Sequence, residues 1–249
     1  MKQLKKIISF LLSLALVFTL CAVHAGAGYK VRYGDAAKAL WEDGLFLGSD
    51  NSFDLDKPLT RAAGATMIVR LLGKEAEAGA GSYTIPFTDV PDWAKSYIGY
   101  CYKNGIVNGT EATTFGSDDN MTSAQYLTLV LRALGYDDKT GDFRWDKAPA
   151  KAFEIGLIDQ AACTEYTTSA QFLRDDAAGI AYAALAQRIK GTDTVLKSAI
   201  TIPGRPEGNM PGYTAADTAA AAESETPSAG AGSTDDWLNA SIGIKTEST

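Results

Sequence analysis

The amino-acid sequence predicts an all-α fold built from three helix–loop–helix units. A similar phrase occurs three times, as Trp41-Glu-Asp-Gly-Leu-Phe, Tyr102-Lys-Asn-Gly-Ile-Val and Phe153-Glu-Ile-Gly-Leu-Ile. Each phrase is followed by a polar stretch and then by apolar residues at helical spacing. The second copy lies 61–62 residues after the first, and the third lies 51 residues after the second. Such self-similarity is typical of stacked supersecondary units, which bury their apolar faces only against one another.

Each copy is expected to open with a helix that stops at a glycine. In the second copy, residues 93–104 place apolar side chains at helical spacing, and Asn104-Gly105 reads as a helix stop. Gly44 and Gly156 hold the same place in the other copies. The stretch after Gly105 is rich in turn formers and contains one aromatic residue, Phe115, which we expect to attach the loop to the core.

The second helix of each copy carries the clearest apolar stripe. In the second copy Thr122 is followed three residues later by Gln125, which predicts a capping box at the start of that helix. Thr60 is the equivalent cap in the first copy, whereas the third copy has no hydroxyl there. The stripes fall at helical spacing: Ala62, Ala65, Ile68, Val69 and Leu72; Ala124, Leu127, Val130, Leu131 and Leu134; Ala177, Ile180, Ala181, Ala184 and Leu185. The units are therefore predicted to span residues 30–75, 84–137 and 142–190.

Both ends of the chain have a different composition. Residues 1–25 combine three early lysines, a long apolar run and the small-residue site Val23-His24-Ala25, which predicts a cleaved signal peptide and export. The alternative is an uncleaved membrane anchor. Residues 201–249 are rich in proline, glycine, alanine, threonine and serine, and we expect a disordered, low-complexity tail because few aliphatic residues are available to offset its ordering entropy.

Charge and residue usage exclude several classes of function. Cleavage of the signal peptide would leave 20 basic against 30 acidic residues, and such an acidic chain is not expected to bind nucleic acid or anionic membranes. It would also remove the only histidine, His24. Nucleophiles activated by imidazole and zinc sites with histidine ligands are then excluded. Carboxylate chemistry, such as the paired acids of glycosidases, is the enzymatic alternative that remains. Among 30 carboxylates some pair always looks plausible, so this signal has almost no specificity, and we expect no enzyme, no cofactor and no metal site.

Two cysteines remain in the predicted mature chain. Cys101 falls on the apolar pattern that leads to Gly105, so we expect a buried free thiol. A disulfide between Cys101 and Cys163 is the alternative, in keeping with an oxidising compartment.

The second copy resembles a surface-layer homology (SLH) domain. The resemblance is carried by Phe87-Thr-Asp-Val-Pro-Asp-Trp-Ala94, Gly105-Ile-Val-Asn-Gly109, Phe115 and Met121-Thr-Ser-Ala-Gln. The first and third copies are similar but more degenerate, and the likeness covers about residues 30–190. It implies three repeats packed as a pseudo-threefold bundle, and a non-catalytic anchor that holds an anionic, often pyruvylated, secondary cell-wall polysaccharide in grooves between neighbouring repeats. The implied location is the bacterial cell wall, outside the cell.

The resemblance also implies which residues bind the polysaccharide. The arginine after the helix-capping threonine is Arg61 in the first copy and Arg174 in the third, but Ser123 in the second, so one groove is expected to be disabled. The motif tryptophan is Trp93 in the second copy and Trp145 in the third. A guanidinium offers a bidentate fork to a carboxylate, and an indole face can cover a sugar ring.

The loop glycines Gly105 and Gly109 complete the implied set, since turns expose backbone N–H groups to anions. Because grooves are shared between repeats, one site is expected to place Arg61 beside Trp93. The alternatives are that the arginines are ordinary surface residues, that the tryptophans are core anchors, and that Gly105 is a helix cap.

Two functions from different classes remain open at this point. The first is an exported wall anchor, with a surface protein as an additional partner docking on the tail. The second is a degenerate module with a structural or protein-interaction role and no sugar binding.

Overall fold

The computed structural model describes residues 29–49 and 51–214. The predicted signal peptide and residues 215–249 of the predicted tail lie outside these ranges. The chain separates into two compact units, residues 1–30 and 31–249.

The described residues form an all-α fold, as predicted, with nine α-helices, two short 3₁₀ helices and no strand. The first part contains α2 (Gly34–Glu42), α3 (Arg61–Leu71), α4 (Glu75–Ala80), η2 (Asp92–Ala94) and α5 (Lys95–Lys103). The second part contains α6 (Ser123–Ala133), η3 (Trp145–Lys147), α7 (Ala148–Glu154), α8 (Gln160–Thr168), α9 (Arg174–Leu185) and α10 (Leu196–Ala199). None of these helices is long and apolar enough to cross a membrane.

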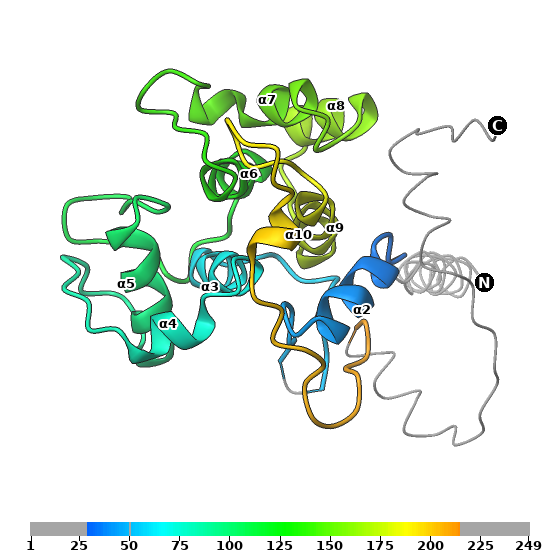
Figure 1. Ribbon diagram of the computed structural model, residues 1–249, viewed down its shortest axis with the longest axis horizontal. Coiled ribbons are helices and arrows are strands. Elements are labelled where there is room, and N and C mark those ends of the chain that lie inside the picture. Colours follow the sequence, from blue (N-terminus) through cyan, green and yellow to red (C-terminus); the bar gives the residue numbers. More distant parts are fainter. Residues whose placement is uncertain (1–28, 50, 215–249) are drawn as a thin grey trace, which may run out of the picture. The chain divides into compact units, whose positions relative to one another are not determined.

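The second helices of the three copies, α3, α6 and α9, each contact the other two and form the centre of the bundle (Figure 1). Their predicted stripes are buried: Ile68, Leu127, Val130, Leu131 and Ala177 are among the least exposed side chains. Burying these faces against one another removes apolar surface from water at about 25 cal/mol per Å². The stripe that periodicity indicates is therefore the core of the bundle.

The first helices do not pack on the second helices of their own copies. Instead α5 packs on α3, α7 packs on α6, and α2 packs on α9 (Figure 1). Each of these three helix pairs, here called a lobe, joins the second helix of one copy to the first helix of the next. The pair of α2 and α9 joins the last copy to the first, so the three lobes form a closed ring. A helix–loop–helix copy is a unit of sequence, but it is not the packing unit.

The predicted caps are present. The Thr60 hydroxyl accepts from the backbone N–H of Ala63 at 3.3 Å. At α6, Thr122 and Gln125 form the reciprocal capping box, with the Thr122 N–H donating to the Gln125 side chain at 2.9 Å. The third copy has Leu173 at this position. These bonds satisfy N–H groups that the first turn of a helix otherwise leaves unpaired.

The polar stretch of the third copy contains a helix that the sequence reasoning did not predict. Asp159 begins α8 by accepting from the Ala162 N–H at 2.7 Å. The equivalent stretches of the first and second copies are irregular. Asp159, followed by helix-forming Gln-Ala-Ala, is the local signal for this helix.

The start of the predicted disordered tail is corrected. Residues 201–214 lie against the first copy, where Ile202, Met210 and Tyr213 pack on the core and backbone hydrogen bonds join Gly212 to Asn51 and Phe53. These residues include few aliphatic side chains, but they are ordered by packing and hydrogen bonding against the folded first copy.

Cys101 and Cys163 are both buried and free. The Cys101 thiol donates to the carbonyl of Ala65 at 3.6 Å, and burial raises the pKa of this thiol to about 12. The free-thiol reading is confirmed, and the alternative disulfide is absent.

Candidate ligand-binding grooves

Two grooves of about 440 Å³ each lie at equivalent places between neighbouring copies. We name them after their arginines. The Arg61 groove is lined by Arg61, Val107, Asn108, Gly109, Thr110, Phe115, Met121, Gln125, Thr128, Leu129, Arg132, Asp138 and Trp145. The Arg174 groove is lined by Phe46, Gly48, Ser49, Ala63, Thr66, Met67, Arg70, Trp93, Tyr97 and Arg174. This size lies in the range of small-ligand sites.

Arg61 stands at the N-terminus of α3 and crosses to the loop of the next copy. Its Nε–H donates to the carbonyl of Phe115 at 2.9 Å, one Nη donates to the carbonyl of Asn108 at 3.0 Å, and the guanidinium lies 4.8 Å from the Phe115 ring centroid. Burial lowers the pKa of Arg61, while Asp119 and Asp89 act the other way. Arginine stays protonated in proteins, so the groove keeps this positive charge.

Arg174 repeats this arrangement at the N-terminus of α9. Its Nε–H donates to the carbonyl of Phe53 at 2.8 Å, and the guanidinium lies 5.4 Å from the Phe46 ring centroid. Burial lowers the pKa of Arg174, with Asp54 opposing this effect. Within the described ranges, no carboxylate lies within ion-pair distance of either Arg174 or Arg61.

Each groove contains a second arginine whose charge is already neutralised. Arg132 donates twice to the Asp138 carboxylate, at 2.7 and 2.8 Å. Arg70 donates twice to Glu75, at 3.0 and 2.9 Å. Each groove therefore presents one arginine that is paired with a carboxylate and one that is held only by carbonyl oxygens. The second kind retains an uncompensated charge for an anionic ligand.

The motif tryptophans are exposed groove residues rather than core anchors. Trp93 and Trp145 are 57% and 56% exposed, whereas Trp41 is 4% exposed. Trp93 belongs to η2 and Trp145 to η3, and each lies in a groove wall. Large exposed indoles on a concave surface are typical of binding sites.

The predicted pairing of arginine and tryptophan is wrong. Arg61 shares its groove with Trp145, and Trp93 shares its groove with Arg174. The reason is the interleaved packing, in which each first helix leaves its own copy to pack on the preceding one. The residues were identified from sequence, but their partners depend on this exchange.

The two predicted loop glycines behave differently. Gly109 lines the Arg61 groove, and a Cβ there would come within 2.4 Å of the Phe87 ring. Gly105 does not line either groove. It has a φ of +70° just after α5, so it terminates a helix. Gly48, with a φ of +73°, is a groove residue that the sequence reasoning missed.

The third interface, between Ser123 and the third copy, is closed. The Ser123 hydroxyl is buried and donates to the carbonyl of Tyr166 at 2.6 Å. This bond corresponds to those that Arg61 and Arg174 make to Phe115 and Phe53. Serine keeps the contact with the neighbouring copy, here through α8, but brings no charge.

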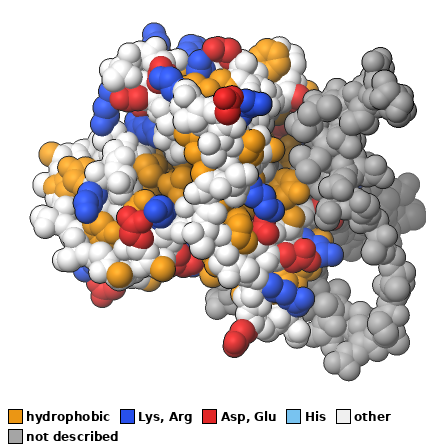
Figure 2. Space-filling model, in the orientation of Figure 1, with side chains coloured by type: hydrophobic (Ala, Val, Ile, Leu, Met, Phe, Trp, Pro, Cys, Tyr) orange, Lys and Arg blue, Asp and Glu red, His pale blue; other side chains and the backbone are white. Residues whose placement is uncertain are grey.

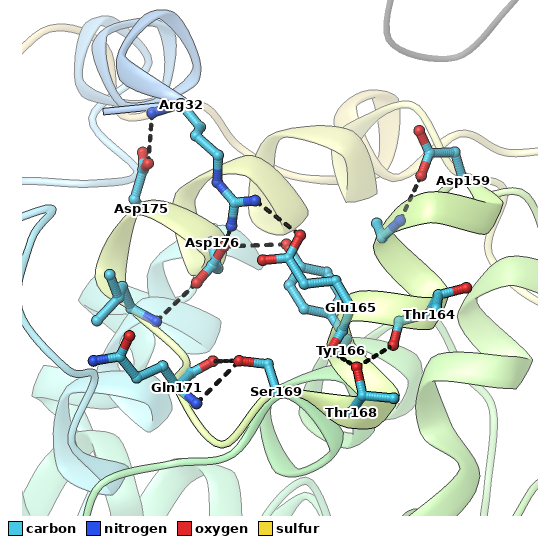
Figure 3. Close-up of polar contacts among 12 residues, drawn as sticks. Arg32, Asp159, Thr164, Glu165, Tyr166, Thr168, Ser169, Gln171, Asp175 and Asp176 are labelled. Carbon is cyan, nitrogen blue, oxygen red and sulfur yellow. Dashed lines mark hydrogen bonds and ion pairs between the residues drawn. The ribbon is translucent and has the colours of Figure 1, made fainter. Parts of the chain in front are cut away.

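Arg32 completes this closure (Figure 3). It lies 12 residues before Gly44, as Trp93 does before Gly105, so it occupies the tryptophan position of the first copy. Its guanidinium donates to Asp176 and, at 2.8 Å, to Glu165 of α8. The Tyr166 hydroxyl also contacts Asp176, at 3.4 Å. Counting back from the glycine would have identified Arg32, but its partner on α8 was not predicted.

The described residues contain no cluster of three potential metal-ligating side chains. On the face in Figure 2, acidic and basic side chains are interspersed instead of forming one continuous basic surface.

Comparisons with known proteins identify the same region of the chain. Residues 86–127 match the S-layer homology domain. A cell surface protein of Thermoanaerobacter kivui is 35% identical over 169 residues, which is 64% of this chain. A surface layer protein of Brevibacillus choshinensis is 33% identical over 146 residues, or 55% of the chain, and an endoglucanase of a Bacillus species is 29% identical over 128 residues, or 47%.

The protein is thus an SLH-domain protein related to surface-layer and other cell-surface proteins. The matched region spans only 22%, 13% and 14% of those three relatives. Because they bear different names, the similarity identifies a shared module and not a shared activity. That the first and third copies are also SLH repeats stays a prediction, supported by their equivalent helices and loop contacts.

Proposed function

We propose that this protein is a non-catalytic anchor of the bacterial cell surface that binds an anionic secondary cell-wall polysaccharide, pyruvylated on its acidic sugar, in two grooves. One observation carries the proposal. Each open groove combines an arginine that lacks a carboxylate partner with a tryptophan that is more than half exposed. A guanidinium is suited to a sugar carboxylate, and an indole face to the apolar side of the same ring.

The occupancy expected from this geometry is two ligands per chain. At the third interface Ser123 replaces the arginine and Arg32 replaces the tryptophan. Arg32 forms ion pairs with Asp176 and Glu165. This interface has neither an unpaired positive charge nor an aromatic platform.

The test is retention of the purified full chain on wall polysaccharide with and without its pyruvate. We expect retention only with pyruvate, and a loss of at least tenfold in affinity for Arg61→Ala or Arg174→Ala, since each removes a charge-assisted contact of about 1.5–3 kcal/mol. The double variant is expected not to bind. Arg188→Ala is the matched control, because Arg188 pairs with Asp193 outside both grooves.

A structural or protein-interaction module without sugar binding is the second candidate. The third interface favours it, because an ion-paired seam there joins the first and last copies and pairs its arginine with two carboxylates. Wild-type retention that is absent or indifferent to pyruvate would establish this candidate. Normal binding by the double variant would instead move the ligand away from the grooves.

A further inference from the structure

We infer that residues 203–214, here called the strap, position Arg174 by supplying hydrogen-bond acceptors to the loop that holds it, as Asp89 does for the loop that holds Arg61. This deepens the proposed function and rests on it for its consequence on ligand binding. The two grooves are equivalent in shape and lining, yet their arginine-holding loops are supported from different parts of the chain.

In the Arg61 groove the support comes from the motif aspartate. Asp89 accepts from the backbone N–H groups of Phe115 at 2.7 Å, Gly116 at 2.6 Å and Ser117 at 3.2 Å. These bonds fix the loop, and the Phe115 carbonyl then accepts from Arg61 at 2.9 Å. Asp89 therefore acts on the arginine through the loop.

The loop of the first copy is equivalent residue by residue. Arg174 donates its backbone N–H to the Lys57 carbonyl as Arg61 does to Asp119, and these acceptors lie 62 positions apart in sequence. The same offset relates Phe53 to Phe115. The residue after each phenylalanine, Asp54 or Gly116, has a left-handed backbone with φ of +50° or +76°. These two residues have the same offset of 62 positions.

The aspartate itself is missing from the first copy. The offset of 61 residues between the first-helix glycines places Gly28 at the position of Asp89, and glycine carries no carboxylate. Three backbone N–H groups, those of Phe53, Asp54 and Leu55, therefore need other acceptors, because unpaired buried donors are costly. The Ser52 hydroxyl accepts from Asp54 at 2.9 Å, which leaves the N–H groups of Phe53 and Leu55.

The strap provides those acceptors. The Phe53 N–H donates to the carbonyl of Gly212 at 2.7 Å, and the Leu55 N–H donates to the carbonyl of Tyr213 at 2.9 Å. These two donors correspond to Phe115 and Ser117. Two neutral carbonyl oxygens thus stand in for one carboxylate.

The strap also supports Arg174 through stacked rings. The Tyr213 ring stacks on Phe53 with centroids 6.4 Å apart, and Phe53 stacks on Phe46 at 5.2 Å. The Arg174 guanidinium lies over the Phe46 ring, at the opposite end of this stack from Tyr213. A continuous series of contacts therefore leads from Tyr213 to the arginine.

Further contacts hold the strap against the first copy. Arg205 lies 4.7 Å from the Trp41 ring centroid, and the Gly204 N–H donates to the Asp43 carbonyl at 3.2 Å. The turn at Gly44 has no space for a Cβ, which would lie 2.4 Å from the Gly204 oxygen. The equivalent Gly105 and Gly156 have nothing within 4 Å of such an atom, so among these three turns the strap covers only that of the first copy.

The experiment compares two full-chain variants by NMR. Met210→Ser/Tyr213→Ser removes two side chains that anchor the strap, and Asp89→Ala removes the support of the other loop. We expect the strap variant to lower amide exchange protection at Phe53 and Leu55 about tenfold or more, and to shift the Arg174 Nε–H resonance, with Phe115 and Arg61 unchanged. Asp89→Ala should give the reverse pattern.

Ligand binding supplies the second readout. In the strap variant, Arg174→Ala should have no further effect on retention, while Arg61→Ala should abolish it. Tyr213→Phe keeps the stacked ring and should restore wild-type protection at Phe53. If the double substitution unfolds the chain, Tyr213→Ser alone is measured in the same way.

The inference is overturned if Phe53 protection and the Arg174 resonance stay at wild-type values in a folded strap variant. Equal loss at both loops would also overturn it, since this would indicate general destabilisation. Absence of wild-type polysaccharide binding would refute the proposed function alone, because the exchange measurements need no ligand.

Discussion

Arg61, Ser123 and Arg174 occupy equivalent positions at the start of the three central helices, and each side chain donates to the carbonyl of an aromatic residue in the neighbouring copy. The shared hydrogen bond joins adjacent copies at all three interfaces. Only arginine extends a charged group into the space beyond that bond. At this position, arginine lines a groove in two copies, whereas serine in the second copy forms only the hydrogen bond between copies.

Asp89 makes the support of the Arg61 groove sensitive to pH. Burial alone would raise the pKa of Asp89, but the hydrogen bonds from Phe115, Gly116 and Ser117 outweigh it and leave the pKa below its ordinary value. The carboxylate therefore stabilises the folded state fully above the unfolded pKa of about 3.9, and this contribution is lost as pH falls through the folded pKa.

Asp89→Ala is expected to lower the free energy of unfolding by about 1 kcal/mol at neutral pH, a modest value because the Asp89 side chain is exposed and solvent screens its charge. The difference from wild type should disappear at the acid end, where Asp89 is protonated in both states. Denaturant titrations across pH measure this, with Asp118→Ala as the control aspartate from the same loop. A difference that persists at the most acid pH would contradict the assignment.

At the scale of elements, the three central helices begin in three ways. Thr60 caps α3 by a hydroxyl, α6 has the reciprocal box of Thr122 and Gln125, and α9 starts at Leu173, whose N–H donates to Asp176 at 2.9 Å. The last arrangement keeps only the second half of a capping box. In this respect the third copy is the most degenerate.

Thr122→Ala is expected to destabilise the protein by about 1 kcal/mol, because the hydroxyl satisfies an N–H at the first turn of α6. Thr122→Ser keeps the acceptor and should stay close to wild type. Urea denaturation followed by circular dichroism gives both values. Equal loss in the two variants would mean that the methyl group, and not the cap, is responsible.

The helix α8 shows how an element changes the role of an interface. Only the third copy has a helix in its polar stretch, and this helix carries Glu165 and Tyr166 to the ring closure. The first and second copies leave that space open as a groove. Degeneration of the third interface is thus a gain of structure as well as a loss of motif residues.

For the whole molecule, the contact between α2 and α9 joins residues more than 140 positions apart and closes the ring of lobes. Burial raises the pKa of Asp176, and the guanidinium of Arg32 acts against this effect. Asp175 accepts from the backbone N–H groups of Arg32 and Tyr33 at 2.7 and 2.9 Å. Specific ion pairs and hydrogen bonds therefore join the first and last copies at this seam.

Arg32→Ala is expected to lower the free energy of unfolding by about 1–2 kcal/mol, a modest value because the Arg32 side chain is partly exposed. The proposed polysaccharide stoichiometry of two should be unchanged, since the third interface has serine in place of the groove arginine. Calorimetric titration measures both stoichiometry and affinity. A third binding event in wild type, or loss of one of the two in the variant, would contradict the closed state of this interface.

Much of the fold could be predicted because its causes are local. Helical spacing of apolar residues identified α3, α6 and α9, threonines marked two of their starts, and glycines marked the ends of the first helices. The candidate site residues Arg61, Arg174, Trp93 and Trp145 all line grooves. Gly105 lines neither groove, and its positive φ at the end of α5 is sufficient reason for a glycine there.

The remaining features depend on contacts between distant segments. The sequence by itself determined the helices, their caps and the residue types available for binding, since these follow from periodicity and side-chain chemistry over a few positions. The tertiary structure decided that Arg61 faces Trp145, that Arg32 closes the third interface, and that a segment of low-complexity composition packs beneath the Arg174 loop. The physical reason is that each first helix buries its apolar face on the preceding copy, an exchange that leaves no mark in local spacing.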